Sequence, residues 1–247
     1  MEHPIPQKGA AHGKKAFQLW QRPALKLQTT TLWEYPSQHY GIGEQGSKHY
    51  EGATPSWVIW NLLTRYTRKD DLVVDPMVGS GTTLDVSKDL GRKARGFDLA
   101  PFRSDIEQGD ARHLPLKNET VDFAFVDPPY STHISYSDHS KCIGKLDARE
   151  GSYFLEMENV INEIFRVLKN KRYFALYVSD SFKKGKPFAP IGFELFCLMR
   201  KRFQPADIVC VARHNKKLKR GNYHRAAVEG NFFLRGFNYL FIMKKDT

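Results

Sequence analysis

A short apolar run followed by a glycine-rich turn most strongly limits the folds open to this chain. Leu72–Val74 is continuously apolar, as expected of a parallel strand that is buried on both faces. Gly79–Gly81 then permits a tight turn, and residues 82–90 are predicted to form a helix that ends at Gly91. A strand, a tight turn and a helix in this order predict an α/β fold with ligands at the carboxyl ends of the strands.

Strands and helices continue to alternate along the chain. Thr54 is predicted to cap a helix whose first residue is Pro55, because apolar residues from Val58 to Tyr66 recur at helical spacing. Further helices are expected at residues 152–170 and 191–199, and further strands at 94–98, 121–126, 172–178, 208–212 and 239–243. This pattern predicts a mainly parallel sheet with helices on both faces.

The length and composition favour one domain. The chain has 247 residues, enough for one sizeable α/β domain and too few for two with separate large cores. We therefore expect a flexible N-terminal arm at residues 1–30 and a single domain at residues 31–247. No apolar run approaches the roughly 20 residues that span a bilayer, and Met1–Lys15 lacks the apolar segment of a secretory signal. These features predict a cytoplasmic protein. The cysteines are widely spaced, so neither disulfides nor a metal site is expected.

An uneven excess of positive charge predicts a polyanionic partner. The formal net charge is +11, and each phosphate that a Lys or Arg neutralises releases counterions and adds affinity for nucleic acid. We expect nucleic-acid recognition loops near residues 131–150 and 213–236, the alternative for the second being a solvated basic loop between two strands. Candidate nucleic-acid-binding residues are Tyr136, Lys141, Lys145, Arg213, His214, Asn215, Lys216, Lys217, Lys219, Arg220 and Arg225.

The tetrapeptide Asp127-Pro128-Pro129-Tyr130 follows a predicted strand and indicates chemistry at an amino nitrogen. An exocyclic amine on adenine or cytosine is a poor nucleophile, because its lone pair is delocalised into the ring. A carboxylate and a rigid backbone carbonyl could localise that lone pair by accepting the two amine protons in hydrogen bonds, and two prolines hold such a geometry at little entropic cost. The alternative is a turn that merely ends the strand.

The glycine-rich segment 75–83 lies between a strand and a helix, the context of a nucleotide-binding turn. It lacks both the Gly-Lys-Ser/Thr ending of a phosphate-binding loop and the spacing of a dinucleotide site, so another cofactor is expected. Asp98 closes the next strand, where it could accept both ribose hydroxyls of an adenosine or, alternatively, cap the following segment. Asp110 could accept an adenine amino group.

Together these motifs resemble the S-adenosylmethionine-dependent DNA amino-methyltransferases of the N6-adenine and N4-cytosine group, from about Thr31 onward. The resemblance implies a Rossmann-like methyltransferase fold, with S-adenosyl-L-methionine as cofactor and the helix from Thr54 packed over its methionine part. The implied cofactor-binding residues are Thr54, Pro55, Asp75, Pro76, Met77, Gly79, Ser80, Gly81, Thr82, Thr83, Asp98, Leu99, Asp110 and Ala111.

The resemblance also implies a mechanism. Asp127 and the Pro128 carbonyl would each accept a hydrogen bond from the target amine, and Tyr130 would stack on a base that has left the duplex. Double-stranded DNA is the implied partner, which would place the protein on the nucleoid, and a cognate restriction endonuclease is a candidate second partner. The sequence contains no information on oligomeric state.

Several substrates remain open. Adenine N6 is favoured, because Asp at the first motif position is commoner in adenine enzymes, and cytosine N4 is the alternative. Some RNA methyltransferases acting on guanine N2 or adenine N6 share the tetrapeptide, but many carry a separate RNA-binding domain, and only about 50 irregular residues precede the first predicted helix. A catalytically inactive DNA-binding module is the remaining alternative. The roughly 120 residues after Tyr130 leave little room for a large recognition domain, so recognition is expected to come from loops and the N-terminal arm.

Overall fold

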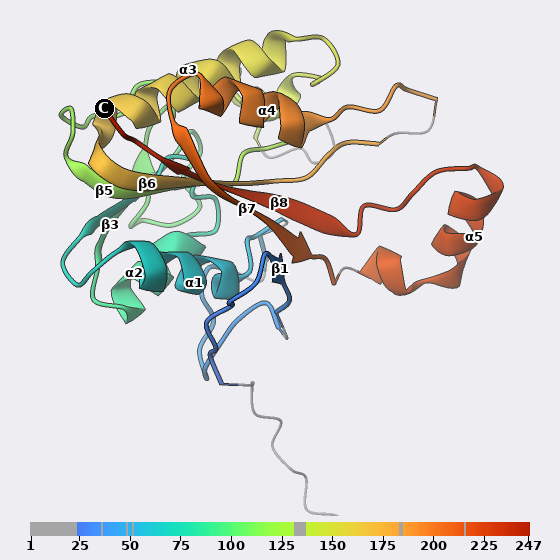
Figure 1. The fold of residues 1–247 in the computed structure, drawn as a ribbon, viewed down its shortest axis with the longest axis horizontal. Helices are drawn as coiled ribbons and strands as arrows, with labels where there is room; N and C mark the ends of the chain where they lie inside the picture. The colour runs from blue at the N-terminus through green and yellow to red at the C-terminus, as the bar shows by residue number, and fades with distance from the viewer. Residues whose placement is uncertain are drawn as a thin grey trace, which may run out of the picture.

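The computed structural model describes residues 24–35, 37–47, 49–50, 52–130, 137–182, 185–214 and 216–247. Its strands are β1 (Leu32–Trp33), β2 (Leu72–Asp75), β3 (Lys93–Asp98), β4 (Glu107–Gln108), β5 (Val121–Val126), β6 (Leu168–Val178), β7 (Gln204–Ala212) and β8 (Phe237–Lys244). Its helices are α1 (Ser56–Tyr66), α2 (Thr82–Asp89), α3 (Ser152–Val167), α4 (Ile191–Arg200) and α5 (Gly221–Glu229), with two short 3-10 turns, η1 (Ile143–Lys145) and η2 (Lys216–Lys219). Figure 1 shows how these elements are arranged.

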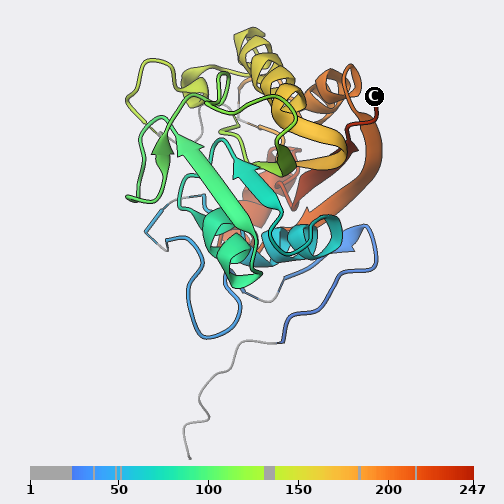
Figure 2. The same cartoon turned by 90° about the vertical axis from the view of Figure 1, so that its left-hand side faces the viewer.

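One mixed sheet organises the molecule, and the predicted Rossmann-like fold is confirmed. The strand order is β1-β7-β8-β6-β5-β2-β3-β4, and all neighbours are parallel except β8, which runs antiparallel to β6 and β7. Helices α3 and α4 cover one face and α1 and α2 cover the other, as two perpendicular views agree (Figures 1 and 2). The strand order reverses beside β2, which pairs with β3 on one side and β5 on the other. Such a reversal opens a crevice at the carboxyl ends of the strands.

Two apolar cores fix the helices to the sheet. On one face, Met157, Ile161 and Ile164 of α3 are fully buried against β-strand residues such as Phe174. On the other face, Leu62 of α1 is buried in a second cluster. Each large apolar side chain buried in this way stabilises the fold by about 1.5–3 kcal/mol. The buried positions of α3 recur at helical spacing, which is why the sequence predicted this helix.

Some boundaries differ from the prediction. Helix α3 ends at Val167 rather than near residue 170, and β6 begins at once with Leu168, before the predicted start at residue 172. The early part of β6 pairs irregularly with β5, and Lys171 has a positive φ of 64°, so this stretch lacks regular strand alternation. Likewise β7 begins at Gln204 rather than at residue 208. The prediction missed its first four residues because they are exposed and form no apolar run.

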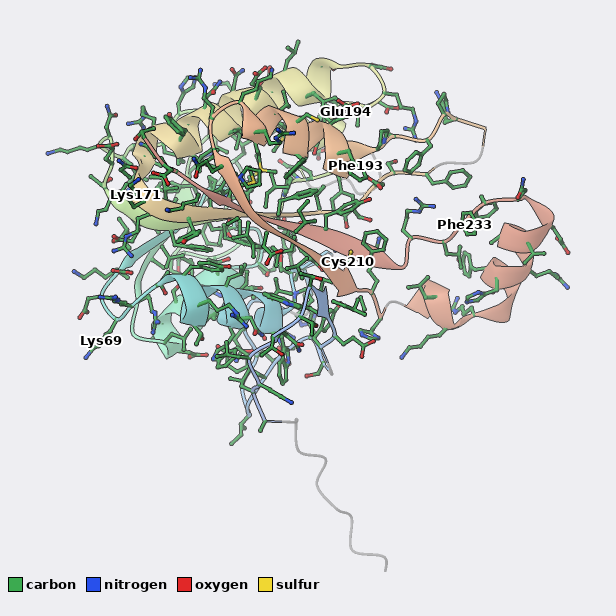
Figure 3. All side chains as sticks on the ribbon, viewed as in Figure 1. Lys69, Lys171, Phe193, Glu194, Cys210 and Phe233 are labelled. Carbon is green, nitrogen blue, oxygen red and sulfur yellow. The ribbon has the colours of Figure 1, made fainter. Side chains whose placement is uncertain are left out.

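The segment predicted as a loop at residues 213–236 contains η2 and α5. Sequence periodicity missed α5, which is short and buries none of its residues. Figure 1 shows the excursion that carries α5 projecting away from the sheet. Phe233, on this excursion, lies at the opposite end of the molecule from Lys69 and Lys171 (Figure 3). Since Lys69 precedes β2 and Lys171 lies near the start of β6, the excursion projects from the edge of the sheet where β2 and β6 end.

Two aromatic contacts link this excursion to the segment between β6 and α4. The rings of Phe182 and Phe232 stack with their centroids 4.8 Å apart, and the guanidinium of Arg235 lies 5.2 Å from the ring centroid of Phe188. Among the residues that the structure describes, none belongs to a helix that is both long and apolar enough to cross a bilayer.

Candidate cofactor and catalytic site

A pocket lies at the carboxyl ends of β2, β3 and β5, at the reversal of strand order. It brings together residues that the sequence predicted separately for cofactor binding and for catalysis. The predicted residues that line it are Thr54, Asp75, Pro76, Met77, Gly79, Ser80, Thr82, Thr83, Asp98, Leu99, Asp110, Ala111, Asp127, Pro129 and Lys141. Pro55, Gly81, Pro128 and Tyr130 do not line it.

The glycine turn shapes one wall of the pocket. Gly79 and Gly81 have φ values of 48° and 85°, in the left-handed region that favours glycine. A Cβ on Gly79 would lie 2.9 Å from the Tyr50 ring, and a Cβ on Gly81 would lie 2.6 Å from the Arg103 guanidinium. Arg103 pairs with Asp85 at the start of α2 at 2.7 Å. The two glycines therefore let Tyr50 and Arg103 approach the turn closely.

Asp75 closes the turn from the end of β2. Its carboxylate accepts hydrogen bonds from Thr83 Oγ1 at 2.6 Å and from the Met77 amide at 3.1 Å. Burial raises the pKa of Asp75 to about 7, although these two hydrogen bonds oppose the shift. Asp75 thus holds the turn in shape and changes charge near neutral pH.

Asp98 ends β3 and contacts the same turn. Its Oδ2 accepts from the Gly79 amide at 3.3 Å, and its Oδ1 accepts from the Ala100 amide at 2.9 Å. Burial raises the pKa of this carboxyl above its ordinary value. The bond to Ala100 is the cap of the following segment that was the alternative role for Asp98. Each oxygen has a further lone pair, so capping does not prevent Asp98 from accepting ligand hydroxyls.

Asp110 is paired with a protein cation. Arg112 donates to it three times, through the backbone amide at 3.1 Å, Nε at 2.8 Å and Nη2 at 2.7 Å. Arg112 also donates to Glu156 at 2.5 Å. Burial would raise the pKa of Asp110, but the hydrogen bonds and charge of Arg112 lower it below its ordinary value. Asp110 is therefore ionised at neutral pH, and only its remaining lone pairs are available to a ligand.

Asp127 follows β5 and is half-buried. Thr54 Oγ1 donates to its Oδ2 at 2.5 Å. Burial raises the pKa of Asp127 to about 7, the charge of Asp75 adds to this, and the Thr54 hydrogen bond and the charge of Arg213 oppose it. Thr54 does not cap α1 as predicted, because Pro55 takes the N-cap position and the helix begins at Ser56. Its hydroxyl is used on Asp127 instead.

A second group of side chains lies near Asp127. Tyr130 is partly buried and packs against the core beneath α3. The positive charge of Arg213 lowers the pKa of both Asp127 and Tyr130, although burial raises both pKa values by more. Arg213 Nη1 donates to Ser179 Oγ at 3.3 Å. The rings of Tyr35 and His214 meet edge to face with centroids 5.2 Å apart. Tyr35, Tyr130 and Arg213 thus come together from three distant parts of the chain.

The predicted nucleic-acid residues divide between two places. Lys141 lines the pocket, and Lys145 Nζ donates to the Asp138 carbonyl at 2.5 Å. Lys219, Arg220 and Arg225 are exposed on the excursion with η2 and α5. Tyr136 and Asn215 lie outside the described residues, as do the side chains of Lys216 and Lys217.

Sequence reasoning missed several residues of these sites. Tyr50 and Phe102 line the pocket and meet edge to face at 5.5 Å, and the buried Cys142 also lines it. Tyr50 belongs to a segment without periodicity, and Phe102 lies in the irregular segment between β3 and β4. Tyr35 lies just after β1, and the pairing of β1 with β7 brings it to His214.

Comparison with known proteins identifies the relatives of this chain. The model of a family described as DNA methylase, N6_N4_Mtase, matches residues 7–108. Over these residues the chain is similar to the N6/N4 DNA methylases. The predicted resemblance is confirmed at this level, and the matched region includes the glycine turn and Asp98 but ends before Asp127.

Curated relatives agree with the family match. A type II methyltransferase, M.MthZI of Methanothermobacter thermautotrophicus, is 25% identical over 122 residues, which are 44% of this chain and 34% of the relative. M.MjaII of Methanocaldococcus jannaschii is 24% identical over 166 residues, 58% of this chain and 31% of the relative. M2.LlaDCHI of Lactococcus lactis subsp. cremoris is 43% identical over 44 residues, 18% of this chain and 16% of the relative. The chain therefore spans about a third or less of the length of these relatives.

Solved structures support the fold alone. TrmN from Thermus thermophilus is 19% identical with a TM-score of 0.51, covering 79% of this chain and 50% of TrmN. Geranyl diphosphate methyltransferase is 14% identical with a TM-score of 0.50, covering 77% and 78%. The [4+2]-cyclase SpnF is 14% identical with a TM-score of 0.51, covering 82% and 89%. Proteins of such different chemistry share this architecture, so function has to be argued from the site.

Proposed function

We propose that this chain is an S-adenosyl-L-methionine-dependent DNA methyltransferase that methylates the exocyclic amino group of a flipped base, adenine N6. The observation that carries the proposal is the position of Asp127. It lies at the carboxyl end of a parallel strand, in the same pocket as the glycine turn and Asp98, with one carboxylate oxygen held by Thr54. The match to a family described as DNA methylase favours DNA as the substrate.

The pocket fits a cationic ligand that carries hydroxyl groups. Among the described residues, four carboxylates and one lysine line it: Asp75, Asp98, Asp110, Asp127 and Lys141. Asp110 is already paired with Arg112, but the acidic lining as a whole is unfavourable for the phosphates of a dinucleotide and favourable for a sulfonium and an ammonium group. Asp98 would hold the ribose hydroxyls, and the wall at Gly79 would approach the cofactor closely. When bound, S-adenosyl-L-methionine supplies a methyl group already activated by a positively charged sulfur, so the protein need not activate it.

The protein must instead activate the target nitrogen. Asp127 would accept one hydrogen bond from the amine and the Pro128 carbonyl the other, which localises the nitrogen lone pair for attack. Asp127 would also receive the proton that the nitrogen loses once it is methylated. A carboxyl group with a pKa of about 7 is suited to accept a proton near neutral pH. Tyr130 would stack on the flipped base, and Tyr35 and Arg213 would border the same space.

The excursion with η2 and α5 is the proposed DNA-binding surface. Lys219, Arg220 and Arg225 are exposed there, and it projects from the same edge of the sheet as the pocket (Figures 1 and 3). Exposed cations can pair with phosphates while neighbouring side chains reach base edges. A cognate restriction endonuclease is the second proposed partner, in line with the type II relatives.

Mass spectrometry of nucleosides tests the proposal. The protein is incubated with methyl-labelled S-adenosyl-L-methionine and, in separate reactions, double-stranded DNA or RNA. The expected product is N6-methyladenine in DNA, absent with Asp127→Ala. N4-methylcytosine would move the proposal to the cytosine alternative, and label in RNA guanine N2 or adenine N6 would overturn the choice of DNA. Binding of DNA without transfer to any substrate would support the inactive module instead.

A further inference from the structure

We infer that Thr54 is a positioning residue for Asp127, holding one carboxylate oxygen so that the other is left for the target amine. This inference rests on the proposed function. It assigns Thr54 a role different from cofactor binding, which was its predicted one.

The hydroxyl of Thr54 is directed to Asp127 although a local role was available. A threonine before a helix usually caps the first turn, but α1 has no side-chain cap, and Pro55 takes the N-cap position. Thr54 is buried, and its Oγ1 donates to Asp127 Oδ2 at 2.5 Å across 73 residues of sequence. Within the described part of the chain, Asp127 Oδ1 accepts no hydrogen bond.

The backbone that carries Thr54 is held on both sides. Gln38 Nε2 donates to the Ala53 carbonyl at 2.8 Å, and the Gln38 carbonyl accepts from the Ser56 amide at 3.0 Å and from Ser56 Oγ at 3.1 Å. Pro55, with a φ of −60°, limits rotation just after Thr54. Thr54 therefore presents its hydroxyl from a rigid site, as a positioning residue must.

The hydrogen bond also affects the charge of Asp127. Burial and the charge of Asp75 raise the pKa of Asp127, and the Thr54 hydrogen bond is the first of the effects that oppose them. Without it the pKa would rise further, because a hydrogen bond donated to a carboxylate favours its ionised form. A protonated Asp127 cannot accept the amine proton. Thr54 thus both orients Asp127 and favours its ionised form.

The first test is made on the cofactor-free protein. Asp127 is titrated by carbon-13 NMR in protein labelled at the aspartate carboxyls, with its resonance assigned through Asp127→Asn. Thr54→Val, which keeps the side-chain shape, is expected to raise the pKa of Asp127 by about one pH unit, and Thr54→Ser to restore it. An unchanged Asp127 titration in a folded Thr54→Val protein would overturn the inference.

The second test is kinetic and uses Thr83→Val as the matched control. Thr54→Val should lower kcat at pH 7 about tenfold, move the acid limb of the pH–rate profile to higher pH, and leave cofactor affinity by calorimetry within about twofold. Thr83→Val removes an equivalent bond to Asp75 and should weaken cofactor binding without moving that limb upward. If Thr54→Val weakened cofactor binding tenfold and left the acid limb in place, Thr54 would be a cofactor residue and the inference would be wrong.

The two proposals fail separately. Absence of methyl transfer by the unchanged protein to DNA and to RNA would refute the proposed function, whereas the NMR titration would still measure whether Thr54 controls Asp127. Transfer by the unchanged protein together with full activity and an unshifted profile for Thr54→Val would refute only the inference.

Discussion

Thr83 at the start of α2 donates a hydrogen bond of 2.6 Å to Asp75 at the end of β2. This bond joins the two ends of the glycine turn. The bond joins a buried carboxyl to the helix that follows it in the chain. Asp75→Asn should therefore disturb the turn as well as remove a charge. We expect cofactor affinity to fall at least tenfold, because the pocket loses both shape and negative potential. Calorimetric titration with S-adenosyl-L-methionine measures this, and an affinity equal to that of the unchanged protein would contradict it.

Replacing Asp127 should separate chemistry from binding. Asp127→Asn keeps the size of the side chain and the bond from Thr54, but the amide is a poor base and cannot take up the amine proton. We expect methylation to fall by at least about a hundredfold, the lower end for a general base, with cofactor affinity changed by less than about threefold. Retained transfer, measured with labelled cofactor, would remove Asp127 from the mechanism.

The stability of the cofactor-free protein should depend on Asp75 and Asp127. Burial raises both pKa values from an ordinary 3.8 to about 7, so between these values the folded protein holds more protons than the unfolded chain. Their contribution to stability is complete below pH 3.8 and is lost as the pH rises to about 7. The Tm of Asp127→Asn relative to the unchanged protein should therefore increase from pH 5 to pH 8, as scanning calorimetry can measure. A difference in Tm that stays constant with pH would contradict the raised pKa.

Glycine substitutions test the turn itself. Gly81→Ala would put a Cβ 2.6 Å from the Arg103 guanidinium at a φ of 85°, so both backbone strain and a displaced ion pair are expected. We expect about 1–3 kcal/mol of destabilisation, measured by urea unfolding. Gly151→Ala is the matched control, because Gly151 has a φ of 79° and its Cβ would meet no atom within 4 Å. An equal loss in the two variants would mean that Arg103 contributes nothing to the turn.

The sequence predicted the parts of the fold in which local pattern and burial agree. The apolar run before Asp75, the glycines at φ values open to few other residues, and the apolar face of α3 each specify one element. Helix α5 was missed because it buries no residue. Tyr35, Tyr50 and the bond from Thr54 to Asp127 were missed for another reason. They depend on how the segment before α1 lies against the sheet, which no local pattern encodes.

The excursion with α5 provides the last prediction. Arg220→Ala with Arg225→Ala should weaken DNA binding and reduce the slope of log affinity against log salt by about two, if each cation neutralises one phosphate. Lys69→Ala with Lys171→Ala is the matched control, since these cations lie at the opposite end of the molecule from the excursion (Figure 3). Binding isotherms from 50 to 300 mM salt, followed by fluorescence anisotropy of a labelled duplex, measure both slopes. Because Arg225 also lies 3.6 Å from Glu229 in an exposed pair, circular dichroism should first show that α5 is retained. If the control lowered the slope as much as the excursion variant, the DNA would contact the basic surface as a whole and not this excursion.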